Sequence, residues 1–444
     1  MFKRKAYDQL LNWKNTWNGQ YACLLEGARR VGKTTIAEEF AKNEYKSYIK
    51  IDFSDVSEDI LSAFDDISRL DNFFLKLQIE TGVQLFKRES LIIFDEVQLY
   101  PRARQAIKHL VADGRYDYLE TGSLISIKKN VKDILIPSEE MRIKVYPMDY
   151  EEFLWATGAN PDVLDAAYKS NIALGNKINQ HMMRDFRIYM AVGGMPQAVA
   201  AYIETNNLEL VDEIKQKILE LYYDDLRKID NSGRMTAMYI NIPSQLANKK
   251  KHFVISSATG KQKTRKDEER LFELIDSGMV LPCYNVKKPE IPLLQTKDFD
   301  HFKLYLSDIG LFTSMLFKNS SNDTSNIYQK LLSDKLPADL GYLYENVVAQ
   351  MLVASGRDLY YHTWQKKDST HYYEIDFLIS MNKKVIPIEV KSSAIKNHES
   401  IDQFAIKYSS QVGRKFLFSQ KDVGKIDDLE LKPIYMTPFL LKEL

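Results

Sequence analysis

The chain has 444 residues, of which 45% are hydrophobic and 27% are charged, and this balance is ordinary for a globular protein. A chain of this length is too long for a single core, so we expect two to four domains. Lysine plus arginine equals aspartate plus glutamate, at 61 each, so the net charge neither supports nor excludes a nucleic-acid partner, and any such surface has to be a local patch.

Short apolar runs alternate with helical stretches from Tyr21 to about Lys144. We expect strands at residues 21–27, 46–54, 90–97 and 116–123, with helices between them at residues 33–43, 73–82 and 102–114. Continuous apolar strands that alternate with helices predict a parallel sheet covered on both faces.

The middle of the chain is expected to be helical from about Pro161 to Leu226, apart from a turn in the string AVGGMPQAV. A short helix, a basic loop, an amphipathic helix ending at Gly278 and two strands follow, in the order of a winged helix. The polar string KNSSNDTSN at residues 318–326 then predicts a linker.

The string GARRVGKT fits the phosphate-loop pattern G-x-x-x-x-G-K-[ST], and it lies between an expected strand and an expected helix. The glycines let the backbone N–H groups face the phosphates of ATP, Lys33 reaches the β and γ oxygens, and the Thr34 hydroxyl ligates Mg²⁺. The following helix adds the positive end of its dipole. The predicted nucleotide-binding residues of this loop are Gly27, Ala28, Arg29, Arg30, Val31, Gly32, Lys33, Thr34 and Thr35.

The apolar string LIIFDEV ends an expected strand on Asp95 and Glu96. Beside a phosphate loop, Asp95 would hold Mg²⁺ through water, and Glu96 would polarise the water that attacks the γ-phosphate. Both motifs should meet at the carboxyl edge of one sheet. The next strand ends in TGS, where Thr121 or Ser123 either senses the γ-phosphate or simply closes the strand as a turn residue.

Six motifs occur in a recognisable order: the phosphate loop, FDEV, ETGS, YPMDYEEFL, GGMPQAV and the terminal string EIDFLISMNKKVIPIEVKSS. This set resembles prokaryotic AAA-type ATPases with a C-terminal restriction-endonuclease-like domain, a family whose members mostly lack an assigned cellular role. The resemblance covers nearly the whole chain and implies a helical lid and a winged-helix region after the ATPase core. The family usually has Gly-Arg before its YPMDYEEFL-like motif, whereas Arg142 occupies the place of that arginine here without the glycine.

The resemblance also implies a role for the terminal string, which is expected to form two apolar strands around a polar turn. In an endonuclease-like fold, Asp376 and Glu389 would hold Mg²⁺ or Mn²⁺, and a helix would add Glu345. Lys391 lies two positions beyond Glu389 and hence on the same face of its strand, where it would act on the attacking water and the scissile phosphate. Glu374 is either a further ligand or a charge at the rim.

The expected fold is therefore a multidomain α/β protein in five segments. These are a P-loop AAA-type ATPase core (1–155), a helical lid (156–226), a winged-helix-like region (227–317), a linker (318–334) and a PD-(D/E)XK endonuclease-like domain (335–444). In the lid, Arg184 and Arg187 either reach the phosphates or belong to a solvated helical face. Two basic loops, at residues 248–253 and 260–266, either bind duplex DNA or are simply solvated.

Cys23 and Cys283 form neither a disulfide framework nor a zinc-binding spacing, which fits a reducing cytosol. His362 and His371 also lack a partner at metal-ligand spacing. The start of the chain has no apolar run of the signal-peptide kind, and no stretch approaches 18 uncharged apolar residues. We therefore expect a cytoplasmic protein without a membrane span.

Together these features predict a protein that binds ATP and hydrolyses it with Mg²⁺, with a nuclease-like C-terminal module directed to DNA. One alternative is an ATP-switched DNA-binding or scaffold protein whose nuclease-like domain only binds. A second is a chaperone-like ATPase that acts on a protein partner, but it leaves Asp376, Glu389 and Lys391 without a role. The DNA substrate, the cellular process and self-association stay open.

Overall fold

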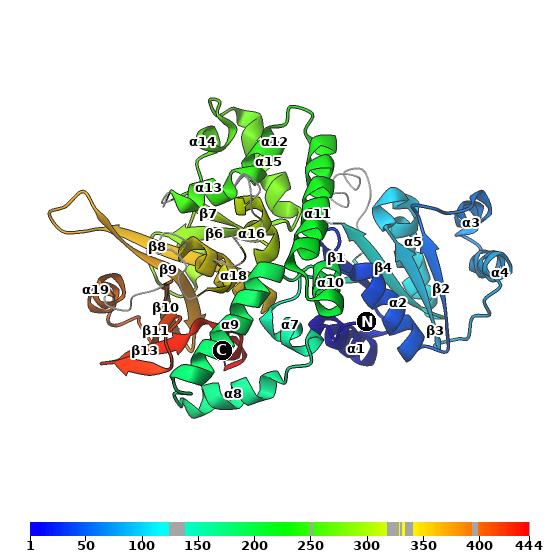
Figure 1. Cartoon of the computed structure of the whole chain (residues 1–444). Coiled ribbons are helices and arrows are strands. Elements are labelled where there is room, and N and C mark those ends of the chain that lie inside the picture. Colours follow the sequence, from blue (N-terminus) through cyan, green and yellow to red (C-terminus); the bar gives the residue numbers. More distant parts are fainter. Residues whose placement is uncertain are drawn as a thin grey trace. The chain divides into compact units, whose positions relative to one another are not determined.

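The computed structural model describes residues 1–123, 138–248, 252–317, 328, 331–333, 341–392 and 398–443. Two compact units make up the chain: the first comprises Met1–Tyr146 with Asp276–Gly278, and the second Pro147–Ile275 with Met279–Leu444. In Figure 1 the first unit runs from blue to cyan and the second from green to red. Among the described residues, no helix combines the length and the apolar character that crossing a membrane requires.

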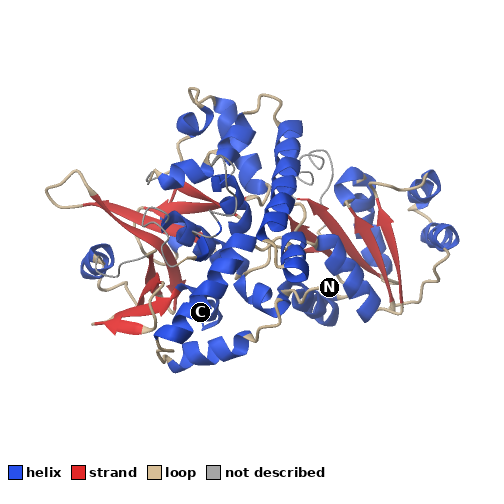
Figure 2. Cartoon of the chain, in the orientation of Figure 1, coloured by secondary structure: helices blue, strands red, loops and turns tan. Residues whose placement is uncertain are grey.

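The first unit is a five-stranded sheet flanked by helices (Figure 2). The strands are β1 (Ala22–Gly27), β2 (Ser47–Asp52), β3 (Ser90–Asp95), β4 (Asp117–Ser123) and β5 (Glu140–Lys144). The helices are α1 (Lys5–Trp17), α2 (Lys33–Glu44), α3 (Glu58–Ala63), α4 (Leu70–Thr81) and α5 (Pro101–Asp113), with short 3₁₀ turns η1 (Phe64–Asp66) and η2 (Val97–Leu99). The strand order is β2-β3-β4-β1-β5, and all neighbours pair in parallel, which confirms the predicted parallel sheet.

This strand order positions the phosphate loop. Strand β1 lies between β4 and β5, and β3 lies on the far side of β4. Because the strands are parallel, the ends that carry Gly27, Asp95 and Thr121 adjoin at one edge of the sheet. Every residue of β1 and β3 is buried, and the buried Phe40 of α2 packs against Trp13 of α1. The buried strands hold this edge in a fixed arrangement.

The second unit begins with a run of helices. They are α7 (Tyr150–Ala156), α8 (Pro161–Ser170), α9 (Asn176–Val192), α10 (Pro196–Thr205), α11 (Leu208–Ile229), α12 (Arg234–Ile240), α13 (Ile242–Ala247), α14 (Ile255–Thr259) and α15 (Arg265–Asp276). Helix α7 falls within the predicted ATPase core of residues 1–155, yet its Tyr150 and Phe153 pack on Tyr189 of α9. The compact first unit consequently ends at Tyr146, nine residues before the predicted boundary.

The predicted turn after α9 depends on two glycines. Gly193 has a φ of 82°, a conformation that disfavours residues with a side chain. A β-carbon at Gly194 would collide with the backbone of Met148. Asp308, which is fully buried, accepts hydrogen bonds from the backbone N–H of Gly194 at 2.6 Å and of Leu311 at 2.8 Å. The glycine pair thus allows close approach between distant segments of this unit.

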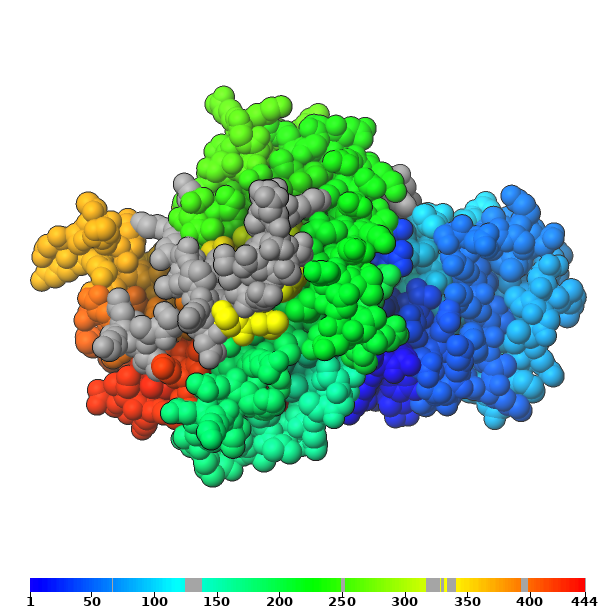
Figure 3. Space-filling model, viewed as in Figure 1, coloured from blue at the N-terminus to red at the C-terminus, as the bar shows by residue number. Residues whose placement is uncertain are grey.

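An eight-stranded mixed sheet follows, in the order β12-β13-β11-β10-β9-β8-β6-β7. Its strands are β6 (Val280–Val286), β7 (Lys297–Leu306), β8 (Leu359–Gln365), β9 (Tyr372–Met381), β10 (Lys384–Val390), β11 (Lys415–Ser419), β12 (Gly424–Ile426) and β13 (Leu429–Pro433). The remaining helices are α16 (Ile309–Phe317), α18 (Gly341–Ala354), α19 (Glu399–Lys407) and α20 (Thr437–Glu443), with the 3₁₀ turns η3 (Leu293–Thr296) and η5 (Ile434–Met436). The tip of the β8–β9 hairpin, orange in Figure 3, projects from the surface of this unit.

Strands β6 and β7 differ from their predicted place. The winged-helix interpretation put them in a region of their own, residues 227–317, separated by a linker from residues 335–444. In the structure β6 pairs in parallel with β8, so the expected wing extends the C-terminal sheet. The physical reason is that β6 has backbone groups to pair on both of its edges, and its local pattern does not indicate the second partner. Most of the predicted linker lies outside the described residues.

Candidate functional site

The phosphate loop curls tightly between β1 and α2. A β-carbon at Gly27 would collide with the carbonyl oxygen of Val145, and Gly32 adopts the left-handed region with φ of 95°. The ammonium of Lys33 donates hydrogen bonds to the carbonyl oxygens of Gly27 at 3.1 Å and Ala28 at 2.9 Å. Burial lowers the pKa of Lys33 to about 8, although the nearby Glu96 and Asp95 act in the opposite direction. The predicted loop residues Arg29, Arg30, Val31, Thr34 and Thr35 complete this loop and the first turn of α2.

The two nucleotide motifs meet at Asp95. The Thr34 hydroxyl donates to Asp95 Oδ1 at 2.8 Å, and the Thr121 hydroxyl donates to the same oxygen. Asp95 is buried at the end of β3, whereas Ser123 lies half-buried at the end of β4. The structure therefore brings together the oxygen atoms of three segments that are far apart in the chain. Hydroxyl and carboxylate oxygens are ligands that Mg²⁺ prefers, so these residues fit the ion.

Glu96 directly follows β3 in an unusual backbone conformation. Its φ of 53° and ψ of 44° lie in the left-handed region, which costs a residue with a side chain about 1 kcal/mol or more. Its N–H donates to the Thr121 hydroxyl at 3.3 Å, and its carboxylate accepts a hydrogen bond from the Gln98 side chain. The fold thus tolerates a strained backbone at Glu96, and this conformation holds the carboxylate beside Asp95.

Arg4 is a residue of this region that the sequence analysis missed. It precedes α1, is only 4% exposed, and donates to the carbonyl oxygens of Val31 at 2.9 Å and Tyr146 at 2.6 Å. Its guanidinium therefore ties the phosphate loop to the segment after β5. The string MFKRK offers no signal for this role, because one arginine among basic residues at a chain start looks solvated.

The other predicted arginines lie in different surroundings. Arg142 on β5 pairs with Glu140 at 3.0 Å and is 43% exposed in its side chain. Arg184 is exposed on α9, but Arg187 is buried and donates to the side chain of Gln420. The alternative of a solvated helical face is therefore wrong for Arg187, because α9 packs that side against the segment after β11.

The terminal hairpin places its charged residues on one face. Strands β9 and β10 are antiparallel with Ile388 opposite Phe377, and this register sets Glu389 beside Asp376. Asp376 Oδ2 accepts the backbone N–H of Val390 at 2.8 Å. Lys391 Nζ lies 2.5 Å from Glu389 Oε2. Glu389 is 1% exposed, and its Oε1 has no hydrogen-bond partner among the described residues.

Two residues of β7 join these carboxylates, and the sequence analysis assigned a role to neither. Lys303 Nζ lies 2.5 Å from Glu374 Oε1 and 3.9 Å from Glu345 Oε2. The Tyr305 hydroxyl donates to Glu345 Oε2 at 3.1 Å. A lysine in the apolar string HFKLYL was the available signal, since buried strands carry charges only at a cost. We call Glu345, Glu374, Asp376, Glu389, Lys303 and Lys391 the C-terminal charge cluster.

Burial and like charge control protonation in the C-terminal charge cluster. Burial raises the pKa of Glu389 to about 8, with a further contribution from Asp376 and an opposing one from Lys391. Burial likewise raises the pKa of Glu345 to about 7. For Lys303 and Lys391, burial acts downward, but the surrounding carboxylates outweigh it and raise both pKa values. Both lysines are therefore cations inside the cluster.

The metal assignment for the C-terminal charge cluster stays a prediction. No group of three or more His, Cys, Asp and Glu side chains in the described part of the chain is arranged to hold a metal ion. The two ammonium groups stand among the carboxylates and occupy their oxygens. Asp376, Glu389 and Glu345 share a neighbourhood without forming a coordination shell.

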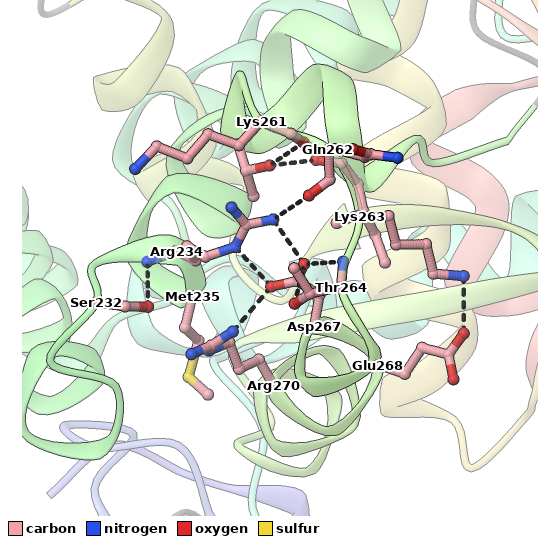
Figure 4. Close-up of polar contacts among 12 residues, drawn as sticks. Ser232, Arg234, Met235, Lys261, Gln262, Lys263, Thr264, Asp267, Glu268 and Arg270 are labelled. Atoms are coloured by element: carbon pink, nitrogen blue, oxygen red, sulfur yellow. Dashed lines mark hydrogen bonds and ion pairs between the residues drawn. The ribbon is translucent and has the colours of Figure 1, made fainter.

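One of the two basic loops is held by a network of hydrogen bonds and ion pairs (Figure 4). The fully buried carboxylate of Asp267 accepts two hydrogen bonds from Arg234 at 2.6 Å, and others from Thr264 and Arg270. Residues 261–266 are exposed, and Lys263 pairs with Glu268 at 2.8 Å. Residues 249–251 of the other loop lie outside the described residues.

Comparison with known families agrees with the geometry of the first unit. Residues 19–154 match the model of a family described as an AAA domain. With the phosphate loop and Asp95 in place, residues 19–154 form an AAA-type domain, and the protein is an ATPase. Residues 183–322 and 340–434 match two domains of unknown function, DUF8612 and DUF4143. A search of curated proteins finds no match.

The solved structures that match this chain are only weakly similar to it. Hsp104 of S. cerevisiae in complex with ADP is 12% identical over 80% of this chain and 44% of its own, with a TM-score of 0.29. This chain therefore spans less than half the length of Hsp104. AMPPCP-bound DnaA from Aquifex aeolicus is 14% identical over 62% of this chain and 88% of its own, with a TM-score of 0.29. Cdc6p from Pyrobaculum aerophilum is 12% identical over 75% of this chain and 93% of its own, with a TM-score of 0.24.

Proposed function

We propose that the first unit hydrolyses ATP with Mg²⁺ held by Thr34 and Asp95. The observation that supports this is the 2.8 Å hydrogen bond between these two residues, because it joins the ligands of both nucleotide motifs at one point. Mg²⁺, when bound, neutralises charge on the phosphates. Lys33 exchanges its two carbonyl partners for phosphate oxygens, and the N–H groups of the loop face the phosphates.

Glu96 is the proposed base beside the attacking water. Its carboxylate leaves Gln98 to do so, while its strained backbone keeps it next to Asp95. Thr121 orients both acidic residues, because its hydroxyl donates to Asp95 and accepts the N–H of Glu96. Ser123, at the end of the same strand, is proposed to face the γ-phosphate. In this proposal Lys33 mainly contributes to the binding of ATP, and Glu96 mainly contributes to the rate of its hydrolysis.

Two substitutions separate binding from chemistry. Lys33→Ala should abolish ATP binding, because the phosphates lose their ammonium partner. Glu96→Gln should bind ATP normally but hydrolyse it about a hundredfold more slowly or worse, since the water loses its base. Lys42→Ala, an exposed lysine at the end of α2, is the matched control. Equal turnover by Glu96→Gln and the parent protein would refute the assignment.

We propose, as a second function, that the C-terminal charge cluster is a divalent-metal site acting on DNA in a PD-(D/E)XK endonuclease-like domain. It is supported by Glu389, a buried carboxylate whose Oε1 lacks a hydrogen-bond partner among the described residues and which lies beside Asp376. A binding or scaffold module remains the competitor, because a fold does not by itself establish an activity. A chaperone-like ATPase would give this cluster no role.

Cleavage assays distinguish these alternatives. Plasmid, linear and branched DNA are incubated with the full chain and Mg²⁺ or Mn²⁺, with and without ATP. Asp376→Asn and Glu389→Gln should each lose cleavage while ATPase activity is kept, because the metal loses an oxygen ligand. Lys391→Met should keep the metal and lose rate. If DNA binds but is not cut under any condition, the binding module is the correct reading.

A further inference from the structure

Lys303 is an unusual residue for the middle of a strand. It lies on β7 opposite Cys283 of β6, and its side chain is 6% exposed. Lysine is almost never this deeply buried unless a partner compensates its charge. Three carboxylates do so: Glu374 at 2.5 Å, Glu345 at 3.9 Å, and Asp376, which is near enough for its charge to act on the ammonium.

The second cation of the cluster differs from Lys303 in access to water. Lys391 pairs with Glu389, but a third of its side chain is exposed, so it can turn outward when a ligand enters. Lys303 is buried, so its ammonium can leave the carboxylates only if β7 itself moves. When all four carboxylates are ionised, the two ammonium groups leave two negative charges uncompensated, which equals the charge of one divalent cation. The raised pKa values of Glu389 and Glu345 favour protons in place of that charge. Leaving such charge buried without compensation is costly.

The cluster also crosses a boundary between families. Lys303 and Tyr305 fall in residues 183–322, whereas the four carboxylates fall in residues 340–434. The two segments meet because β6 pairs with β8 and brings β7 into the same sheet. The C-terminal segment by itself would therefore lack one cation and the hydroxyl that binds Glu345.

We propose that Lys303 is an internal cation that occupies the C-terminal charge cluster and competes with a divalent metal for its carboxylates. The inference builds on the proposed second function and adds a mode of regulation to it. A metal ion gains Glu345 and Glu374 as free ligands only when the ammonium withdraws from them. Any movement of β7 would accordingly change metal affinity at Asp376 and Glu389.

The test is a titration of the full chain with Mn²⁺ in the absence of nucleotide. Electron paramagnetic resonance of the free ion measures how much Mn²⁺ is bound. Lys303→Met keeps the length of the side chain and removes its charge. We expect its Kd for Mn²⁺ to fall at least tenfold, and Asp376→Asn in the same background to cancel that gain. Lys384→Met, an exposed lysine of β10 that binds the Ser410 carbonyl, should leave the Kd unchanged.

An unchanged or weaker Kd in Lys303→Met overturns the inference, even if the parent protein cuts DNA. A tenfold gain supports it, even if neither protein cuts DNA and the proposed second function fails. Should Lys303→Met not fold in the absence of metal, its recovery on refolding with Mn²⁺ answers the same question. Rescue by Mn²⁺ that Asp376→Asn abolishes supports the competition, and failure of rescue contradicts it.

Discussion

The Thr34 hydroxyl donates a hydrogen bond to Asp95 Oδ1 at 2.8 Å, although 61 positions separate the two residues in the chain. The contact forms because β1 and β3 flank β4 in a parallel sheet, so both residues reach its carboxyl edge. It pre-arranges two of the oxygen atoms that we propose for Mg²⁺. The contact is thus the structural link between the phosphate loop and the acidic strand end.

Thr34→Val should weaken the use of Mg²⁺ more than the binding of ATP. Valine has nearly the same shape but lacks the hydroxyl, so the Mg²⁺ concentration for half-maximal ATPase activity should rise about tenfold or more. Thr34→Ser retains the hydroxyl and should stay close to the parent protein. Titration of Mg²⁺ at saturating ATP measures the effect, and an identical Mg²⁺ dependence in Thr34→Val would contradict the ligand role.

Arg4→Met should loosen the phosphate loop. The carbonyl oxygens of Val31 and Tyr146 lose their donor, and each unsatisfied buried group costs about 1–3 kcal/mol. We expect the free energy of unfolding to fall and the Kd for ATP to rise about fivefold or more, at a temperature where both proteins are folded. Arg4→Lys keeps the positive charge but replaces the planar guanidinium with a single ammonium group. Its stability and its Kd for ATP should therefore lie between those of the parent protein and Arg4→Met. A purely structural role would lower stability and leave the Kd unchanged.

Asp267→Asn should destabilise the second unit. Asp267 is fully buried and accepts hydrogen bonds from two half-buried arginines, so the substitution removes the charge that both arginines contact, at a cost of about 1–3 kcal/mol. Urea unfolding measures the change. The neighbouring Glu268→Gln removes an exposed pair with Lys263 and should cost less than about 1 kcal/mol. A similar loss in the free energy of unfolding for both variants would show that the network around Asp267 stabilises the unit no more than the exposed pair does.

His362 should make stability fall in mild acid. It is 2% exposed, its Nδ1 donates to the Val286 carbonyl at 2.6 Å, and its Nε2 accepts the Tyr408 hydroxyl at 2.9 Å. Burial lowers its pKa to about 4. The unfolded chain takes up the proton near pH 6.5, whereas the folded chain takes it up only near pH 4. Stability is therefore lost as pH falls through this window, by an amount of the order of 3 kcal/mol.

The predicted fall in stability with falling pH is tested by measuring the unfolding of His362→Gln and of the control His371→Gln across pH 4–7. The exposed His371 should contribute almost nothing, so its variant should follow the parent protein. His362→Gln can keep both hydrogen bonds but cannot titrate, and its stability should therefore depend less steeply on pH. Equal slopes in all three proteins would refute the prediction.

Local patterns were sufficient for the parts of this protein that one segment builds. The glycines and lysine of residues 27–34 specify a loop, and the apolar run before Asp95 specifies a buried strand, because each requirement is met within a few residues. The alternation in residues 374–391 likewise predicts a hairpin with Glu389 and Lys391 on one face. Turn geometry then sets its register, since Asn382 and Lys383 both have positive φ.

Only the tertiary structure decided which distant groups join those segments. Arg4 reaches the phosphate loop and Lys303 reaches Glu374 because sheet order brings remote strands and chain ends together, and no local pattern encodes sheet order. The pairing of β6 with β8 shows the same limit: the wing predicted from its hairpin became part of a larger sheet. A buried charge is stable only with its partners, so the partners of Lys303 are a property of the assembled fold rather than of any short string.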